Sequence, residues 1–168
     1  MTKITQRIFV LAWLSLFSSL VLAQQAETSA PEVMDQQQLE SIVRDFADNA
    51  KGGGGVVEFV YNNVPMAMLS NAEFDRMRIV APIIRYQELS RPEIDAALAA
   101  NYHRALDARY ALSDGVLYSV YIHPLSSMNE VQLRSAIFQV SNLALSFGDQ
   151  FSSGVLDFGA AQNQNPQN

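Results

Sequence analysis

The chain has 168 residues, enough for one domain with its own apolar core, and 49% of them are hydrophobic, as in ordinary globular proteins. It contains no cysteine, which excludes a disulfide framework and a thiolate metal site. Its 17 acidic residues against 11 basic ones disfavour nucleic acids and anionic lipid surfaces as partners.

The N-terminal segment, residues 1–23, has the features of a secretory signal peptide. Lys3 and Arg7 precede an apolar run over residues 8–22, which is short for a membrane span. Small residues just before Gln24 suit cleavage by a signal peptidase. The sequence therefore predicts a periplasmic or secreted protein that begins at Gln24 after processing, with no membrane insertion once the signal is removed.

The remaining sequence is divided into three parts by composition. A polar lead-in covers residues 24–34, an α+β domain covers residues 35–158, and a Gln- and Asn-rich tail covers residues 159–168. The lead-in and the tail offer little apolar surface to bury, so we expect both to be disordered.

The domain begins with a predicted helix over residues 35–50. Asp35 and Gln38 fit a capping box, and apolar residues recur after them at helical spacing. The helix is expected to end at the glycine run that follows Lys51. This run lacks the Lys-Ser/Thr pair and the following helix of a phosphate loop, so it predicts no phosphate site.

Three strands are expected next. Residues 56–61 and 64–69 are rich in β-formers, and the Asn-Asn pair between them suits a two-residue hairpin. A third strand is predicted over residues 76–80, with Met77 and Ile79 facing inward and a proline at position 82 closing it.

A second helix is predicted over residues 90–102. Ser90 and Glu93 form a capping box with a proline between them, which is a strong helix start. Its apolar stripe is expected to comprise Ile94, Ala97, Leu98 and Tyr102.

A β-hairpin is predicted over residues 106–123, and two loop lengths compete for it. A two-residue Asp114-Gly115 turn would pair Arg109 with Val120 and place a charge among aliphatic side chains. A three-residue loop pairs Arg109 with Ser119 instead, so we expect that register. The polar face of the hairpin then carries Asp107, Arg109, Tyr121 and His123.

This polar face is the predicted ligand or partner surface. Arginine offers a planar fork for carboxylates, and tyrosine offers a rigid amphipathic surface. The alternative is an ordinary solvated sheet face with weak cross-strand contacts.

The last and longest helix is predicted to start with a capping box at residues 127–130 and to keep one apolar face toward the sheet. Val131 and Phe138, with Leu145, lie on its flank and form a predicted patch for a partner or for a second copy in a homodimer. The alternative is that the first helix or residues 152–158 fold over this patch.

The predicted order is helix, three strands, helix, two strands, helix: an α+β fold with an antiparallel five-stranded sheet packed against the helices. This order resembles the type III secretion chaperone-like fold, especially the YbjN-like bacterial family. The residues that carry the resemblance are Asn101 at a helix end and the hairpin that follows it as far as Tyr118. The resemblance implies a small binding module that often dimerises and holds a polypeptide, and it supplies no catalytic motif. Because secretion chaperones are cytosolic, the export signal argues against a type III secretion role.

Catalytic chemistry has little support in the sequence. The only histidines are His103 and His123, and they do not have metal-ligand spacing, so no metal and no cofactor is expected. The serines do not form a Gly-x-Ser-x-Gly elbow.

The sequence therefore predicts a non-enzymatic exported protein that binds a polypeptide or small ligand. One alternative is an enzyme that uses His103 or His123 as an acid/base group. Another is a structural subunit of an envelope assembly.

Overall fold

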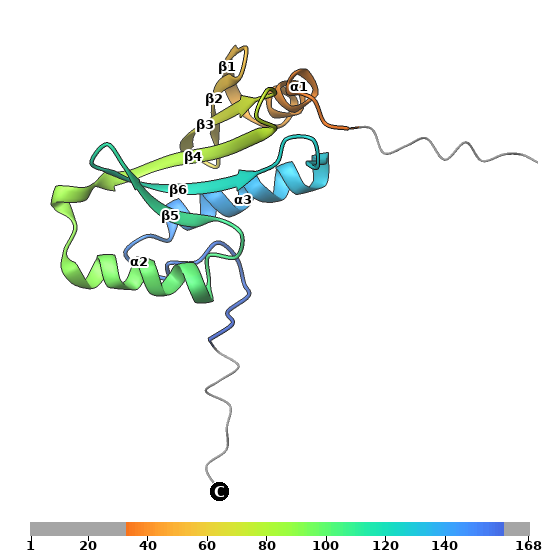
Figure 1. Ribbon diagram of the computed structural model, residues 1–168. Coiled ribbons are helices and arrows are strands. Elements are labelled where there is room, and N and C mark those ends of the chain that lie inside the picture. Colours follow the sequence, from red (N-terminus) through yellow and green to blue (C-terminus); the bar gives the residue numbers. More distant parts are fainter. Residues whose placement is uncertain (1–32, 160–168) are drawn as a thin grey trace, which may run out of the picture. The chain divides into compact units, whose positions relative to one another are not determined.

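The computed structural model describes residues 33–159 (Figure 1). The predicted signal peptide, most of the lead-in and nearly all of the tail lie outside these residues. Within them, the elements in chain order are α1 (Gln36–Phe46), β1 (Asp48–Gly53), β2 (Val56–Tyr61), β3 (Val64–Asn71), β4 (Arg76–Arg85), a 3₁₀ turn (Tyr86–Glu88), α2 (Arg91–His103), β5 (Arg109–Ser113), β6 (Val116–His123) and α3 (Glu130–Leu145).

The strands form one antiparallel sheet in the order β1-β2-β3-β4-β6-β5. The α+β prediction is confirmed, but the sheet has six strands instead of five. The additional strand is β1, formed by residues that were expected to end the first helix. That helix ends at Phe46. Asn49 has a left-handed conformation, with φ 54°, and it lies at a register shift between the Asp48–Val60 and Lys51–Glu58 pairs.

The glycine run forms the turn between β1 and β2. Gly54 and Gly55 have φ values of 65° and 100°, a region that favours glycine. A Cβ atom on Gly55 would also lie 2.6 Å from the Ser70 carbonyl oxygen. The run is thus a hairpin turn between two strands at the edge of the sheet, and no helix follows it as one would in a phosphate loop.

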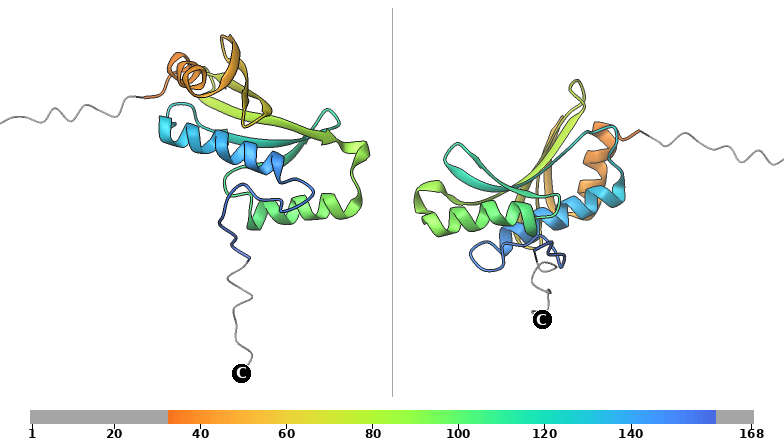
Figure 2. Two further views of the ribbon diagram at one scale, coloured as in Figure 1. Left: turned by 180° about the vertical axis from the view of Figure 1, so that it is seen from behind. Right: turned by 60° about the horizontal axis from the view of Figure 1, so that its bottom comes forward.

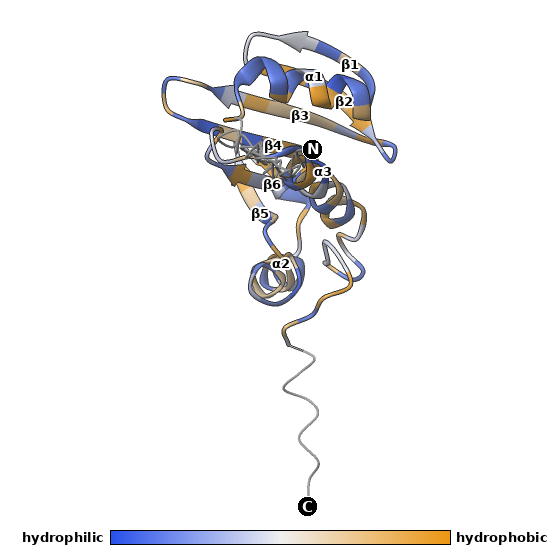
Figure 3. Ribbon diagram, turned by 90° about the vertical axis from the view of Figure 1, so that its right-hand side faces the viewer, coloured by the Kyte–Doolittle hydropathy of each residue, from blue (hydrophilic) through white to orange (hydrophobic). Residues whose placement is uncertain are grey.

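The helices occupy one face and one edge of the sheet. α1 packs on β1 and β2, and α3 crosses the same face over β4 and β6 (Figure 2). α2 packs against β5, beyond the last strand of the sheet (Figure 3). Among the described residues, no helix lies on the opposite face, which we call the uncovered face.

All three α-helices begin with a capping box, and the first two boxes are the ones predicted from the sequence. The caps are Asp35 with Gln38, Ser90 with Glu93, and Asn129 with Gln132, so the third box lies two residues later than predicted. Each cap satisfies backbone donors that the first helical turn leaves free and contributes about 1 kcal/mol.

The core lies between the sheet and the pair α1 and α3. Full burial of an aliphatic side chain stabilises the fold by about 1.5–3 kcal/mol. The large side chains that are fully buried here include Leu39, Val43, Val57, Met68, Met77, Ile79, Leu133, Ile137 and Leu143.

Two strands end later than predicted, β3 at Asn71 instead of residue 69 and β4 at Arg85 instead of residue 80. The turn at Asn62 and Asn63 is confirmed, with φ values of 51° and 62°. β4, however, continues past Pro82 to Arg85, because a bulge between Pro82 and Ile84 accommodates the residue that has no N–H donor.

The hairpin register predicted from the sequence is wrong. Arg109 pairs with Val120 and Ser113 with Val116, so the loop is the two-residue turn Asp114-Gly115, with φ values of 48° and 73°. The objection to this register was that it buries Arg109 among aliphatic residues. That objection fails because Arg109 is exposed and pairs with Val120 on the uncovered face.

The apolar stripe predicted for α2 is also wrong in part. Leu98 and Tyr102 are 62% and 77% exposed, whereas Ala97 and Ala100 are buried. α2 packs against β5, and the small side chains of these alanines allow the helix to approach the end of the sheet closely.

The segment after α3 is tied to the end of α2. Ser153, fully buried, donates its backbone N–H to the Arg104 carbonyl (3.1 Å) and its hydroxyl to the Ala105 carbonyl (2.6 Å). The Arg104 guanidinium pairs with Asp157 at 2.9 Å. Residues 146–158 therefore act as a closing segment for the junction between α2 and β5.

Candidate functional site

The four residues predicted to form one ligand surface are not brought together on one face. Tyr121 is 7% exposed and lies on the helix-covered face, where it packs in the core. His123 stacks on it with ring centroids 6.0 Å apart and an interplanar angle of 17°. The structure therefore uses this aromatic pair for packing at the end of β6.

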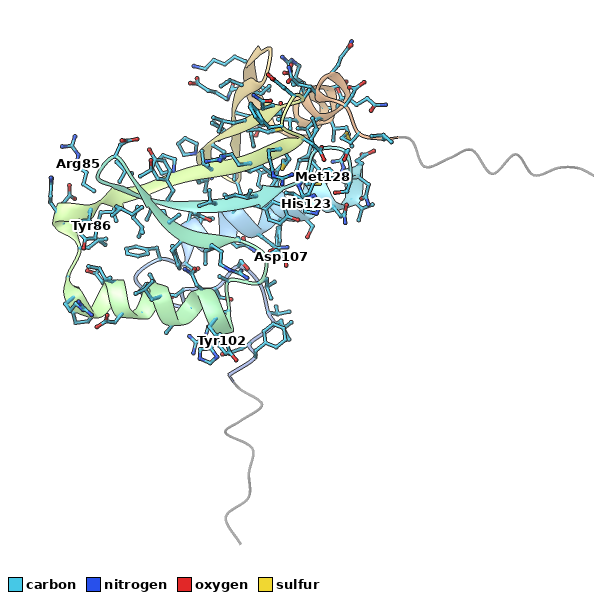
Figure 4. The ribbon with its side chains drawn as sticks, viewed as in Figure 1. Arg85, Tyr86, Tyr102, Asp107, His123 and Met128 are labelled. Atoms are coloured by element: carbon cyan, nitrogen blue, oxygen red, sulfur yellow. The ribbon has the colours of Figure 1, made fainter. Side chains whose placement is uncertain are left out.

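Asp107 lies in the connection between α2 and β5, ahead of the first strand residue (Figure 4). The Gln139 side chain on α3 fixes this connection by accepting hydrogen bonds from the backbone N–H groups of Asp107 (3.0 Å) and Ala108 (3.3 Å). Burial, and secondarily the negative charge of Asp107, raise the pKa of the Tyr121 hydroxyl. These contacts give Asp107 and Tyr121 structural roles in the fold, without a ligand.

Arg109 is the only one of the four on the uncovered face. Its cross-strand partner there is Val120, and its guanidinium donates hydrogen bonds to the carbonyl oxygens of Leu106 and Ala108. Arg109 thus lies at the β5 edge of that face, apart from Tyr121.

The histidines occupy separate places. His123 Nδ1 is 2.9 Å from the Pro124 carbonyl oxygen, and the His103 ring meets Tyr102 edge to face. Among residues 33–159 no group of three His, Cys, Asp or Glu side chains is arranged to hold a metal ion. In the same range, no helix has the length and apolar character needed to cross a bilayer.

The predicted partner flank on α3 is exposed. Val131 is 78% and Phe138 47% exposed. A hollow of about 600 Å³ lies between Phe138 and Leu145 on one side and Ser152 and Val155 on the other. Residues 152–155 therefore lie beside the C-terminal end of this flank. The alternative prediction, that residues 152–158 fold over the patch, holds only at that end, and Val131 and Phe138 remain exposed.

The uncovered face carries a continuous pattern across the whole sheet. Because directly paired residues of antiparallel strands share a face, the pairings define one row from edge to edge. In order from β1 to β5 that row is Lys51, Glu58, Ala67, Val80, Val120 and Arg109. Its middle is apolar and its ends are charged.

A groove of about 600 Å³ lies on this face above β2, β3 and β4. Its apolar lining includes Val60, Pro65, Ala67, Leu69, Val80, Pro82 and Tyr118. Lys51 and Glu58 stand at its β1 end and form an ion pair of 3.0 Å. The size is in the range of ligand pockets in proteins, and the lining suits a ligand with apolar groups.

This surface is not predicted from the sequence, because the apolar alternation of residues 116–122 predicts that Val116, Tyr118, Val120 and Ile122 face the core. In the structure all four lie on the uncovered face, where they pair with outward residues of β4. A usable signal was present in β4. With Met77 and Ile79 inward, alternation puts Val80 and Pro82 on the other side.

No protein-family model and no curated protein matches this chain. Solved structures do match its fold. The HopA1-SchA chaperone-effector complex (11% identity, TM-score 0.48) covers 65% of this chain and 88% of its own, and the ExsC-ExsE complex (12%, 0.49) covers 65% and 90%. The Yersinia pestis type III secretion chaperone SycH, in complex with a stable fragment of YscM2, has 13% identity and a TM-score of 0.50 and covers 67% of this chain and 98% of its own. The chain thus has an α+β fold of the type III secretion chaperone kind.

Proposed function

We propose that this chain is a non-enzymatic exported protein that binds a polypeptide on the uncovered face of its sheet. The observation that carries the proposal is the apolar groove of about 600 Å³ on a sheet face that no described helix covers. An exposed apolar hollow of this kind marks an interaction site. SycH, which shares the fold, was solved with a polypeptide fragment bound, and this supports a polypeptide as the ligand.

Of the residues predicted as a ligand surface, the proposal retains Arg109 and adds the groove. Asp107, Tyr121 and His123 are assigned to the folded core and its connections instead. Tyr118, half-buried in the groove lining, becomes the central contact residue of the site.

Site-specific crosslinking tests the binding site. A photoreactive phenylalanine analogue replaces Tyr118 in the full chain, and a matched variant carries it at Leu98, which is exposed on α2. Illumination in the native host should give crosslinked adducts at position 118. Mass spectrometry of the crosslinked peptides should identify one defined polypeptide segment as the partner. Equal adducts from both positions would contradict a binding site on the uncovered face.

We also propose membership of the YbjN-like family, which rests on Asn101 and the hairpin after it. In support, Asn101 bridges α2 and β5 by hydrogen bonds to the Tyr110 backbone, which gives the helix-end asparagine a defined structural role. A solved YbjN-like structure that lacks an equivalent asparagine bridge would remove this support.

Export is tested through the indole group. The chain has a single tryptophan, at position 13 in the predicted signal peptide, outside the described residues. Protein recovered from the periplasm or medium should begin at Gln24 and show tyrosine emission without an indole band. N-terminal sequencing that finds Met1 on the native protein would contradict cleavage.

Self-association through the Val131 and Phe138 flank belongs to the same proposal. Two large exposed apolar residues on one helix flank suit a self-complementary contact across a two-fold axis. Sedimentation velocity over a micromolar dilution series should show a dimer that Phe138→Glu converts to monomer. A monomer at every concentration would remove the homodimer.

A further inference from the structure

The outward side chains of β4 follow an ordered pattern of charge. Met77 and Ile79 point into the core, so their neighbours point to the uncovered face. Arg85, which follows the bulge, pairs with Val116 on that same face (Figure 4). The outward positions are therefore, in order, Arg76, Arg78, Val80, Pro82 and Arg85. Arginines stand at both ends of β4 and the apolar groove lies between them.

Arg78 and Arg85 are the two of these arginines without a hydrogen-bond or ion-pair partner among the described residues, whereas Arg76 donates to the Asp75 carbonyl at 2.8 Å and lies near the Asp75 charge. Among the described residues, Arg76, Arg78 and Arg85 take part in none of the ion pairs, and all three are exposed. Across the sheet Arg109 adds a further guanidinium whose hydrogen bonds go to carbonyl oxygens. A guanidinium without a carboxylate partner is a ready site for an acidic group.

The acidic residue that faces this side within the groove is already paired. Glu58 lies 3.0 Å from Lys51 at the edge of the sheet, far along the row from Arg109. Asp48, which pairs with Val60, is a second acidic residue on this face. Among the strand residues of the uncovered face, Lys51, Arg76, Arg78, Arg85 and Arg109 still outnumber these two acids, so the face is basic in a chain whose net charge is −6. The sequence-level expectation that anionic partners are disfavoured averages over both faces and does not hold for this one.

On the basis of the proposed function, we infer that the bound polypeptide is an extended segment with an apolar centre and acidic residues on both sides. Its apolar side chains fill the groove over Val80 and Pro82. Its carboxylates face Arg78 at one end and Arg85 at the other. At about 3.3 Å per residue these arginines are roughly 20 Å apart, so the two acidic positions lie about six residues apart in the segment.

Other occupants fit this face less well. A second copy placed across a two-fold axis would bring the β4 arginines of both copies together, which repels. An anionic bilayer would satisfy the arginines, but it is flat, whereas the apolar surface is hollowed. A chain segment matches both the charge order and the concave shape.

A set of matched synthetic peptides tests the inference. The probe peptide has a Val-Thr centre with two glutamates at each end. Fluorescence anisotropy measures its binding to the protein purified from the host in its naturally processed form. A control peptide has glutamine in place of every glutamate, and another has the glutamates in the centre and the valines at the ends. The acid-flanked probe should bind about tenfold more tightly than either control, and rising salt should reduce that advantage.

Variants of the protein locate the contact. Arg78→Gln and Arg85→Gln should each weaken binding of the acid-flanked probe by about twofold to fivefold and leave the glutamine peptide unaffected. Arg91→Gln on α2 is the matched control, because that arginine pairs with Asp95 away from the face, and it should change nothing. Circular dichroism on each variant confirms that it is folded.

The outcomes separate this inference from the proposed function. If the glutamate and glutamine peptides bind equally, and Val80→Glu weakens both, the groove binds polypeptides but the charge order does not select them. If no peptide binds, or binding is insensitive to Val80→Glu, both ideas fail. Sedimentation with phosphatidylglycerol vesicles that depends on Arg78 and Arg85, without peptide binding, would overturn the inference in favour of lipid.

Discussion

The side-chain amide of Asn101 hydrogen-bonds to both backbone groups of Tyr110. Its Nδ2 donates to the Tyr110 carbonyl at 3.2 Å, and its Oδ1 accepts from the Tyr110 N–H at 2.7 Å. Tyr110 lies on β5, the edge strand, so Asn101 supplies the two hydrogen bonds that a further strand would supply. The amide thereby closes this part of the sheet edge against pairing with another chain.

Asn101→Ala should lower the free energy of unfolding by about 1–3 kcal/mol, because the Tyr110 N–H and C=O both lose their partner in a partly buried place. Chemical denaturation measures the loss, and hydrogen exchange of the Tyr110 amide should accelerate. Asn101→Asp keeps the acceptor and should lie between wild type and alanine. An alanine variant as stable as wild type would show that water replaces the amide without cost.

The register of the second hairpin predicts opposite effects at adjacent positions. Leu117 is buried on the helix side, whereas Tyr118 lines the groove. Leu117→Asp should unfold the domain or cost more than about 4 kcal/mol, since it buries a charge without a partner. Tyr118→Asp should remain folded, and Arg109→Ala should cost less than about 1 kcal/mol. Thermal melts compare the variants, and the reverse order would contradict this assignment of Leu117 and Tyr118 to the two faces of the sheet.

Gln139 predicts a second loss of hydrogen bonds, in the connection before β5. Its side-chain oxygen accepts from Asp107 and Ala108, and Gln139 is 6% exposed. Gln139→Leu should leave both donors unpaired and cost about 2 kcal/mol in urea unfolding. Gln139→Glu keeps an acceptor and serves as the control, with a smaller loss expected.

Asp75 predicts a pH dependence. The Ser126 N–H and hydroxyl bind its carboxylate at 2.6 and 2.8 Å, and these hydrogen bonds, backbone first, lower the pKa of Asp75. A lowered pKa in the folded state contributes stability above the unfolded value of about 4, and that contribution is lost as the pH falls through the folded value. The Tm gap between wild type and Asp75→Asn should therefore narrow below about pH 4.

Ser126→Ala removes the hydroxyl donor and provides the direct check. NMR titration of Asp75 in this variant should give a pKa closer to the ordinary value than in wild type. An unchanged titration would assign the shift to the backbone N–H alone.

Local signals predicted most of the fold. The capping residues Asp35 and Ser90 and the Asn62-Asn63 turn act through neighbouring backbone, so the sequence is sufficient to locate them. β1 was not predictable in this way, because its residues have poor strand propensity and depend on pairing with β2. Sheet pairing across distant residues overrides local preference here.

The site was harder to predict because it depends on which face of the sheet the helices cover. The true register pairs Arg109 with Val120, and the sequence disfavours this pairing only if aliphatic neighbours are taken to mean a buried core. Val120 and Tyr118 are aliphatic and aromatic neighbours on a face without helices. Residue pattern alone does not distinguish a buried apolar face from a binding surface.

The contacts of Ser153 and Asp157 affect the order in which the domain can form. They connect to Arg104 and Ala105 across sequence separations of 48 to 53 residues. During synthesis, the junction between α2 and β5 therefore stays incomplete until the last residues of the domain have emerged. Premature termination within the closing segment would leave a nearly full-length chain in which the Arg104 and Ala105 carbonyl oxygens at this junction lack their partners, and limited proteolysis would detect the exposed junction.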